Sequence, residues 1–277
     1  MSTEQSIRSV NWHLWSRCNY DCRFCYVRNF PGRLNVLENG EYILSRLKEL
    51  GIEKITFVGG EPMMHPLIYE LLALSKKMGF TNSVTTNGSF INEVTIKKIA
   101  QYTDWVGISI DSPSEDIEKQ LGRGRGHHVA QAKKAAMLVL SHGMKLKINT
   151  TVTKINFRDD LTGLIEELKP DRWKIFQMLH IPYQNSNCIE ALGINDEDFT
   201  RFVKKHEGIL LKNGQRPVFE RCEDMTGSYF MIGPQGDVII NESGQYSELS
   251  FDELTKDSLK ECVNGTKYFS RGALYDW

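Results

Sequence analysis

The sequence has no long apolar segment and no excess of charge of either sign. No apolar run approaches the roughly 20 residues that a membrane-spanning helix requires. The 34 basic and 35 acidic residues nearly cancel, so no broad basic surface for DNA or RNA is expected. The polar stretch from Met1 to Ser9 lacks the apolar core of a signal peptide. We therefore expect a cytoplasmic protein that binds neither membranes nor nucleic acids.

Cysteine is scarce, and half of it is concentrated in one short segment. Of the six cysteines, three fall at Cys18, Cys22 and Cys25, while the others lie far apart beyond residue 180. In a reducing compartment, bunched cysteines indicate metal ligands rather than a disulfide framework. The sequence therefore predicts a metal site early in the chain.

No Gly/Ser-rich linker divides the first two thirds of the chain, where short β-rich runs alternate with amphipathic stretches. We expect strands at residues 10–15, 54–58, 83–86, 105–110, 146–153 and 172–178, with helices between them at 38–50, 66–78, 92–101, 129–142 and 159–168. This spacing is close to the roughly 30 residues of a parallel strand–helix unit. Six units are too few to close an eight-stranded barrel. The fold class predicted for residues 9–180 is therefore α/β, an open, partial (βα)6 barrel.

The rhythm changes beyond residue 180. A helix is expected at 196–206, and a β-hairpin at 229–232 and 237–240 around Gly233-Pro234-Gln235-Gly236. We expect residues 181–277 to form an α+β extension that covers the barrel. On this interpretation residues 1–277 are a single domain.

The cysteine loop offers three thiolates, whereas a [4Fe–4S] cube needs four ligands. One iron would stay open for a small molecule. A structural zinc site is the alternative, but it requires a fourth Cys or His close by. His13 lies five residues upstream and Cys188 is distant, so neither completes a usual zinc spacing. The spacing favours the cluster.

A second motif, Gly59-Gly60-Glu61-Pro62, directly follows the second expected strand. Two glycines allow the backbone to approach a ligand closely at the C-terminal rim of the strands, where barrel sites form. Alone, this motif is a common turn. After a cysteine loop and a strand it indicates a binding site.

Four cations are expected on the inner faces of the strands. Strand side chains alternate between two faces, and the apolar face should pack against helices. This leaves Lys54, Lys147, Arg172 and Lys174 pointing into the barrel. Such a group of charges is costly unless a polyanion, such as a triphosphate, matches it. The alternative is that Lys54 and Arg172 reach solvent at strand ends.

These motifs resemble those of known enzymes. The C-x3-C-x2-C loop, with an aromatic residue before its last cysteine, and the GGEP motif are similar to the signatures of the radical S-adenosylmethionine (SAM) superfamily. The stretches 11–13, 121–126, 147–149 and 172–177 further resemble viperin and viperin-like enzymes. The resemblance runs from about residue 9 to Trp277 and is weakest over 181–220.

The resemblance implies a radical SAM barrel that holds a [4Fe–4S] cluster on Cys18, Cys22 and Cys25. The residues implied to contact SAM are Gly60, Glu61, Thr86, Asn87, Ser109 and Arg123. Those implied to contact the nucleotide are Asn11, His13, Lys54, Lys147, Asn149, Arg172 and Lys174, and Tyr229 is the implied last hydrogen donor.

Viperins remove the ribose 4′ hydrogen of a nucleoside triphosphate and release the 3′ hydroxyl as water. The 3′-deoxy-3′,4′-didehydro product terminates viral polymerases. The resemblance implies this reaction here, with CTP favoured and UTP or GTP as alternatives. It also implies an electron donor such as flavodoxin or ferredoxin, and the iron–sulfur assembly machinery, as partners.

Three departures from the family stand out. About ten residues precede the first expected strand, where the animal enzyme has an amphipathic membrane helix, which favours a microbial homologue serving defence against phage. A family lysine after the hairpin is missing from 241–246, so Gln245 or Arg271 would take over its phosphate contact. The basic C-terminal tail is short. The rival interpretations are a radical SAM enzyme acting on another anionic substrate, and a nonenzymatic zinc-binding module.

Overall fold

A single sheet organises the chain in the computed structural model, which describes residues 6–241 and 246–277. Its strand order within the described residues is β10-β9-β8-β1-β2-β3-β4-β5-β6-β7. The six central strands are all parallel, as predicted. They are β1 Ser9–His13, β2 Lys54–Val58, β3 Thr81–Thr86, β4 Trp105–Ser109, β5 Lys145–Val152 and β6 Arg172–Gln177.

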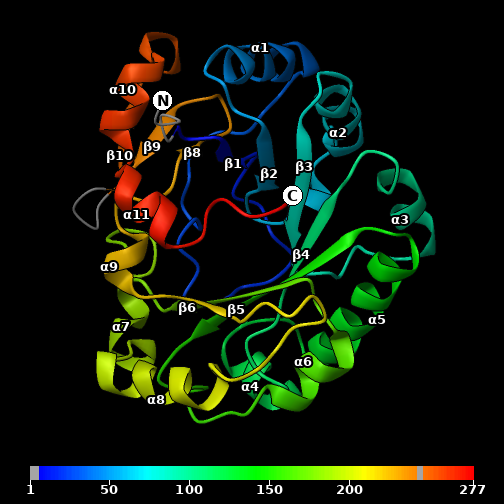
Figure 1. Cartoon of the computed structure of the whole chain (residues 1–277), viewed down its shortest axis with the longest axis vertical. Helices are drawn as coiled ribbons and strands as arrows, with labels where there is room; N and C mark the ends of the chain where they lie inside the picture. Colours follow the sequence, from blue (N-terminus) through cyan, green and yellow to red (C-terminus); the bar gives the residue numbers. More distant parts are fainter. Residues whose placement is uncertain (1–5, 242–245) are drawn as a thin grey trace.

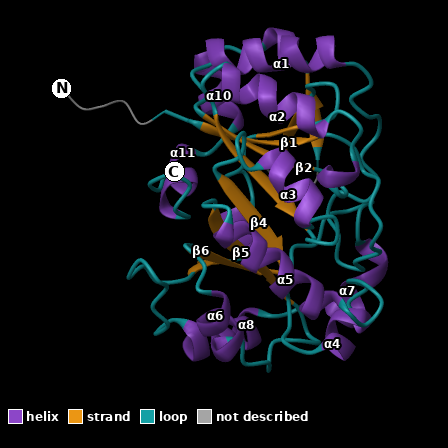
Figure 2. Cartoon of the chain, turned by 90° about the vertical axis from the view of Figure 1, so that its right-hand side faces the viewer, coloured by secondary structure: helices purple, strands orange, loops and turns teal. Residues whose placement is uncertain are grey.

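Helices cover the outside of these strands (Figures 1 and 2). They are α1 Leu37–Glu49, α2 Ile68–Lys77, α3 Glu93–Ile99, α4 Glu115–Gln120, α5 His128–Ser141 and α6 Thr162–Leu168, with a 3-10 turn, η1, at Pro62–Met64. The sequence predicted all of these helices except α4, which follows β4 without an apolar period. This open, partial barrel confirms the α/β fold class.

Period-two alternation decides which side chains face the barrel lumen. On β5, Leu146, Ile148 and Val152 are completely buried. The intervening Lys147 and Asn149 line the central cavity. Apolar side chains turn toward the helices because that removes them from water, and the pleat then directs the polar residues between them inward.

The residues beyond 180 add short strands to both edges of the sheet. β7 (Val218–Glu220) is parallel to β6, and β8 (Met231–Ile232) is parallel to β1. The predicted hairpin is confirmed but is shorter than expected, with β8 pairing to β9 (Val238–Ile240). β10 (Ser247–Leu249) completes the sheet. The division of the chain at residue 180 stays a prediction.

The connecting segments of this region are helical. They comprise η2 Ser186–Cys188, α7 Ile189–Leu192, α8 Asp196–His206, α9 Cys222–Met225, η3 Phe251–Glu253, α10 Lys256–Cys262 and α11 Gly265–Ser270. The bounds of α8 are those predicted. The short α9 links β7 to β8, the two strands that border the open side of the barrel.

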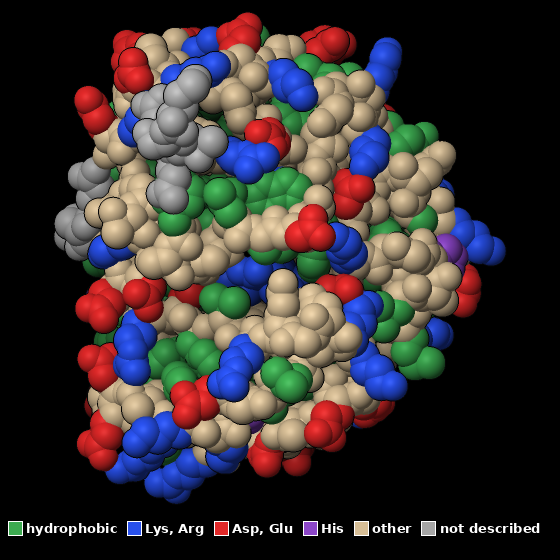
Figure 3. All heavy atoms as spheres, in the orientation of Figure 1, with side chains coloured by type: hydrophobic (Ala, Val, Ile, Leu, Met, Phe, Trp, Pro, Cys, Tyr) green, Lys and Arg blue, Asp and Glu red, His purple; other side chains and the backbone are tan. Residues whose placement is uncertain are grey.

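The last residues cross the middle of the molecule from α11 (Figure 1). The Trp277 ring lies 5.7 Å from Cζ of Arg8, and the Tyr275 ring contacts the Trp105 ring edge-on. In the same orientation, Figure 3 shows Lys and Arg side chains within a hollow at the middle of this face. None of the helices in the described part of the chain has the length and apolar content to cross a membrane.

Candidate active site

A cavity of about 480 Å³ occupies the barrel lumen. Most of the predicted site residues line it, namely Asn11, Cys18, Cys22, Cys25, Lys54, Gly60, Thr86, Asn87, Ser109, Arg123, Lys147, Asn149, Lys174 and Tyr229. The structure does not place His13, Glu61 or Arg172 in the cavity wall. The cavity therefore joins the cysteine loop, which follows β1, to the cations near the first residues of the strands.

Backbone contacts hold the cysteine loop in place. The amides of Asp21 and Arg23 donate to the carbonyls of Gly122 and Leu121, at 3.1 and 2.9 Å. A Cβ atom at Gly122, whose φ is +82°, would lie 2.1 Å from the Asp21 oxygen. The loop that contains Gly122 is thus held against the cysteine loop, and only glycine, which has no side chain, fits at this contact.

The three cysteine thiols suit a cationic iron–sulfur group. Burial raises the pKa of Cys22 to about 12, and it raises the pKa values of Cys18 and Cys25 as well. The thiols are therefore protonated on their own, and positively charged iron would favour the thiolates. Cys18, Cys22 and Cys25 all line the same cavity, so their thiolates could ligate three irons of one cluster and leave the fourth iron open.

Glu61 is fully buried behind the cavity wall, and its expected contact with SAM stays a prediction. Its carboxylate accepts hydrogen bonds from the Thr86 hydroxyl at 2.7 Å and the Asn87 amide at 2.8 Å. The Asn87 side chain donates in turn to Asn19 on the cysteine loop at 2.9 Å. Burial raises the pKa of Glu61 to about 6, although these donors oppose the shift. Glu61 thus positions Thr86 and Asn87.

Arg123 is held by two buried acids that the sequence did not single out. Its Nε donates to Asp111 at 2.6 Å and lies 3.6 Å from a Glu118 oxygen. Burial and the nearby Asp111 raise the pKa of Glu118 to about 8. An acidic helix such as 115–120 normally faces solvent, so no pattern in its residues indicates that Glu118 turns inward.

Lys147 and Asn149 are polar side chains of the lumen with unsatisfied groups among the described residues. The Lys147 ammonium has no hydrogen bond or ion pair among the described residues. Burial and the nearby Arg172 lower its pKa to about 8. Oδ1 of Asn149, two residues along the same face, is buried without a partner in the described structure. Buried polar atoms are rarely left unpaired, so both side chains point to a ligand.

Lys54 and Arg172 are not solvent-exposed at strand ends, because the C-terminal segment covers them. Cζ of Arg172 lies 3.9 Å from the centre of the Tyr275 ring, and Nζ of Lys54 lies 4.0 Å from it. The Lys54 ammonium also hydrogen-bonds the Tyr275 hydroxyl, and Arg172 donates to the Gly272 carbonyl. The short tail therefore reaches the cationic end of the lumen and stabilises both charges through its ring.

Within the described residues, Lys174 is paired with a protein carboxylate, unlike Lys147. Glu220, at the end of β7, forms an ion pair with Lys174 and is fully buried. Arg271 lies 4.0 Å from the same carboxylate. A three-residue strand in an irregular region shows no period in the sequence, so nothing indicated that Glu220 faces the lumen. Gln245, the other candidate for the missing phosphate contact, lies outside the described residues.

His13 is a buried aromatic contact rather than a cavity residue. Its ring meets the edges of Tyr26 and Phe30, with centroids 6.1 and 5.1 Å apart. Burial lowers its pKa to about 3, so the ring is neutral at pH 7. Both ring nitrogens lack a partner in the described residues. Asn11, two residues earlier, does reach the cavity.

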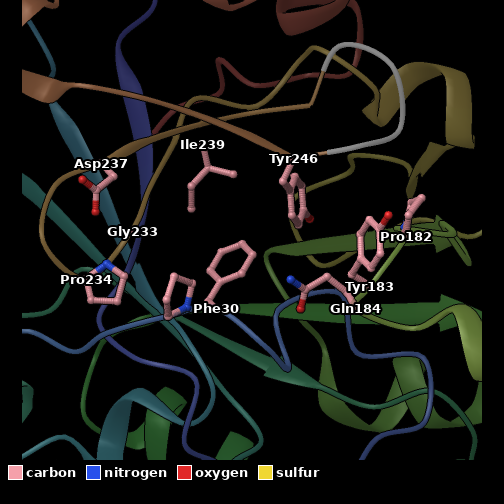
Figure 4. A pocket seen from close by; sticks show the side chains of 10 residues that line it. Phe30, Pro182, Tyr183, Gln184, Gly233, Pro234, Asp237, Ile239 and Tyr246 are labelled. Atoms are coloured by element: carbon pink, nitrogen blue, oxygen red, sulfur yellow. The ribbon is translucent and has the colours of Figure 1, made fainter.

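A second cavity of about 360 Å³ adjoins this aromatic group (Figure 4). Phe30, Ile239 and Tyr246 form its middle, with Tyr183 at one end and Asp237 at the other. Tyr246 also lines the central cavity, so this ring is part of the wall between the two.

Comparisons with known proteins agree with this geometry. Residues 12–168 match the family model of the radical SAM superfamily. The chain is 36% identical to an S-adenosylmethionine-dependent nucleotide dehydratase of Thermoplasmatales archaeon (strain ISO4-H5), with all of both chains covered. It is 34% identical to a protein of the same name from Flammeovirga pacifica, over 100% of this chain and 98% of that protein.

The solved structures show a similar fold. Streptococcus suis SuiB bound to S-adenosylmethionine superposes with a TM-score of 0.67. The match covers 97% of this chain and 68% of SuiB at 17% sequence identity. At that identity the likeness concerns the fold alone.

Proposed function

Because this chain belongs to the radical SAM superfamily, and within it to the S-adenosylmethionine-dependent nucleotide dehydratases, we propose that it dehydrates a nucleoside triphosphate at the ribose. The observation that carries the proposal is the shared cavity. Lys54, Lys147 and Lys174 line one part of it, and the cysteine loop lines another. A substrate with a highly charged end and a reactive carbon farther along fits that arrangement.

The protein is an enzyme whose cofactors are a [4Fe–4S] cluster and SAM. Cys18, Cys22 and Cys25 would hold the cluster. The residues that would contact SAM line the same cavity and are Gly60, Thr86, Asn87, Ser109 and Arg123. When bound, the reduced cluster and SAM supply an adenosyl radical able to remove a hydrogen atom from an unactivated carbon.

The protein's own part is to hold the nucleotide. Lys147, Lys174 and Arg271 would bind the triphosphate, and Asn149, next to Lys174 across the β5–β6 pair, would contact the ribose. The ribose loses its 4′ hydrogen atom, the 3′ hydroxyl takes up a proton and leaves as water, and one electron completes the double bond. Tyr229 is the proposed donor of that electron.

The product would be the 3′-deoxy-3′,4′-didehydro triphosphate, which lacks the hydroxyl that a polymerase extends and so acts as an antiviral chain terminator. CTP is the proposed substrate, because Asn11 lines the cavity and can hydrogen-bond a base. UTP and GTP are the alternatives.

The experiment that tests the proposal is a substrate panel. Reduced enzyme is incubated with SAM and each of CTP, UTP, GTP and ATP, and 5′-deoxyadenosine is measured. At least one triphosphate should stimulate release about tenfold or more, as binding energy from remote substrate groups is used at the reacting centre. The matching monophosphate should stimulate it far less. No stimulation by any triphosphate would refute the proposal.

Triphosphate affinity should fall as pH rises from about 7 to about 9. Burial lowers the pKa of Lys174 to about 7 and that of Lys147 to about 8, so both lose protons in this range. A bound polyanion favours the protonated ammonium, which means that binding takes up protons above neutral pH. Calorimetry of cluster-free protein in two buffers of different ionisation enthalpy measures this uptake. Affinity that rises over the same range would show that these lysines do not bind the phosphates.

An acidic redox protein such as flavodoxin or ferredoxin is the proposed electron donor. The iron–sulfur assembly machinery is the proposed source of the cluster. Arg17, Arg23, Arg33 and Arg125 are exposed around the cysteine loop and have no acidic partner among the described residues. By contrast, the exposed Arg201 is paired with acids on its own helix. Unpaired cations around a redox centre attract an acidic partner and speed its encounter.

Charge reversal tests this surface. Arg23→Glu combined with Arg125→Glu should slow cluster reduction by flavodoxin about tenfold at low salt, while reduction by dithionite should stay unchanged. Arg216→Glu, an exposed site whose arginine hydrogen-bonds only a carbonyl among the described residues, is the matched control. Equal loss with both reductants would indicate damage to the cluster site and not to a docking surface.

A further inference from the structure

Glu220 and Tyr229 meet across the open side of the barrel. Glu220 ends β7 at one edge of the parallel strands, and Tyr229 precedes β8 at the other. The Tyr229 hydroxyl donates a hydrogen bond to one carboxylate oxygen of Glu220. Nζ of Lys174 donates to the same hydroxyl at 3.0 Å and forms an ion pair with the other oxygen. These three groups thus form a closed set of contacts at the wall of the cavity.

Glu220 is a charged group in a cationic environment. Burial alone would raise its pKa, but Lys174 and Arg271 lower it below the usual value, so Glu220 is ionised. Cζ of Arg271 also lies 3.6 Å from the centre of the Tyr229 ring. Asp21 is the one acidic residue that lines the cavity within the described residues, and it pairs with Arg28 on the cysteine loop. Glu220 is therefore the carboxylate that faces the phosphate-binding cations.

We propose that Glu220 is the proton acceptor of Tyr229 and the counter-charge that a bound triphosphate replaces at Lys174, so that it supports turnover while it weakens substrate binding. This inference rests on the proposed nucleotide dehydration. It adds a role for a carboxylate that opposes the substrate's own charge. A carboxylate among the phosphate-binding cations weakens triphosphate binding. Its presence is explained if it takes part in the reaction.

In the last step of the proposed reaction the phenol proton of Tyr229 moves to Glu220. Tyr229 gives one electron to the nucleotide after water has left, its O–H bond breaks, and an O–H bond forms on Glu220. Tyr229 is oxidised to a neutral phenoxyl radical and the nucleotide is reduced. The external one-electron donor then reduces the radical, and Glu220 returns the same proton to the phenolate oxygen. The existing hydrogen bond already connects the two oxygens between which the proton moves.

The decisive variant is Glu220→Gln, which keeps the size of the side chain but accepts no proton and carries no charge. Calorimetry with the cluster-loaded enzyme, without SAM or reductant, should show triphosphate binding about threefold to tenfold tighter, because one opposing charge is gone. The loaded enzyme should still release 5′-deoxyadenosine on addition of triphosphate. The yield of dehydrated nucleotide per 5′-deoxyadenosine should fall at least about tenfold, because the late step lacks its proton acceptor.

Two further variants separate this role from a structural one. Tyr229→Phe should lower the same yield without tightening triphosphate binding, and Glu220→Asp should restore part of it. If Glu220 merely fastens β7 to β8, Glu220→Gln will weaken binding and slow both products equally, and that result would overturn the inference. So would an unchanged yield together with unchanged affinity.

Should Glu220→Gln fail to fold because Lys174 is left unpaired, the double variant Glu220→Gln with Lys174→Gln removes both charges of the pair. Its product yield per 5′-deoxyadenosine should remain low, and a wild-type yield would again overturn the inference. Failure of the proposed function looks different. In that case the wild-type enzyme itself would show no triphosphate-stimulated 5′-deoxyadenosine.

Discussion

Replacement of Gly60 by alanine should displace the cysteine loop, with loss of bound iron and at least about a hundredfold loss of activity. A Cβ atom at this position would lie 2.0 Å from the carbonyl oxygen of Arg17 and 2.4 Å from its carbon. Both are backbone atoms next to Cys18, so they cannot turn away as a side chain would. The Gly60 amide also donates to the Trp15 carbonyl at 2.7 Å, which holds the two segments at this separation.

Iron content and the visible absorbance of the reconstituted protein measure the effect. Gly163→Ala is the matched control, because a Cβ atom there meets nothing within 4 Å. Gly163 lies within α6, where alanine should stabilise the fold by about 0.5–1 kcal/mol. A Gly60→Ala protein with full iron and wild-type activity would show that this close approach does not shape the cluster site.

Replacement of Lys147 by methionine should have two effects of opposite sign. Triphosphate affinity should fall about tenfold to a hundredfold, the equivalent of roughly 1.5–3 kcal/mol for a charge-assisted contact. The substrate-free protein should become more stable, because desolvation and the nearby Arg172 disfavour the Lys147 ammonium, which has no hydrogen bond or ion pair in the described residues. Methionine keeps much of the side-chain length and removes the charge.

Calorimetry with cluster-free protein measures the affinity, and thermal unfolding measures the stability. The control is Lys133→Met on the outer face of α5, where the lysine pairs with Glu167 in a partly exposed ion pair of small expected effect. A Lys147→Met protein that binds triphosphate normally would remove Lys147 from the phosphate site. A less stable one would mean that its ammonium has a favourable environment in the free protein.

The periodic placement of apolar residues predicted the strands and most of the helices of the barrel. In β5 the alternation of apolar and polar residues, together with the length of the strand, placed Lys147 and Asn149 in the lumen. Lys174 was placed by the same reasoning on β6. The cysteine spacing needed no fold prediction, because its chemistry depends on local sequence, whereas the glycine motif became informative only through its place after an expected strand.

The site residues that the sequence analysis missed lie in segments where apolar residues do not recur at a regular spacing. β7 is three residues long, so alternation cannot indicate which face Glu220 occupies. Tyr275 lies in the irregular C-terminal segment, and only tertiary packing brings it to Lys54 and Arg172. The role of Glu61 toward SAM stays a prediction, and its motif could not show that its carboxylate accepts hydrogen bonds from Thr86 and Asn87.

The most direct test of the central claim follows a single hydrogen atom. The enzyme is reduced and incubated with SAM and the 4′-deuterated form of the triphosphate that is most active in the panel. Mass spectrometry of the released 5′-deoxyadenosine should show one deuterium, and the nucleotide should lose the elements of water. Unlabelled 5′-deoxyadenosine formed alongside the dehydrated nucleotide, or labelled 5′-deoxyadenosine without dehydration, would contradict the assignment of this cavity to ribose dehydration.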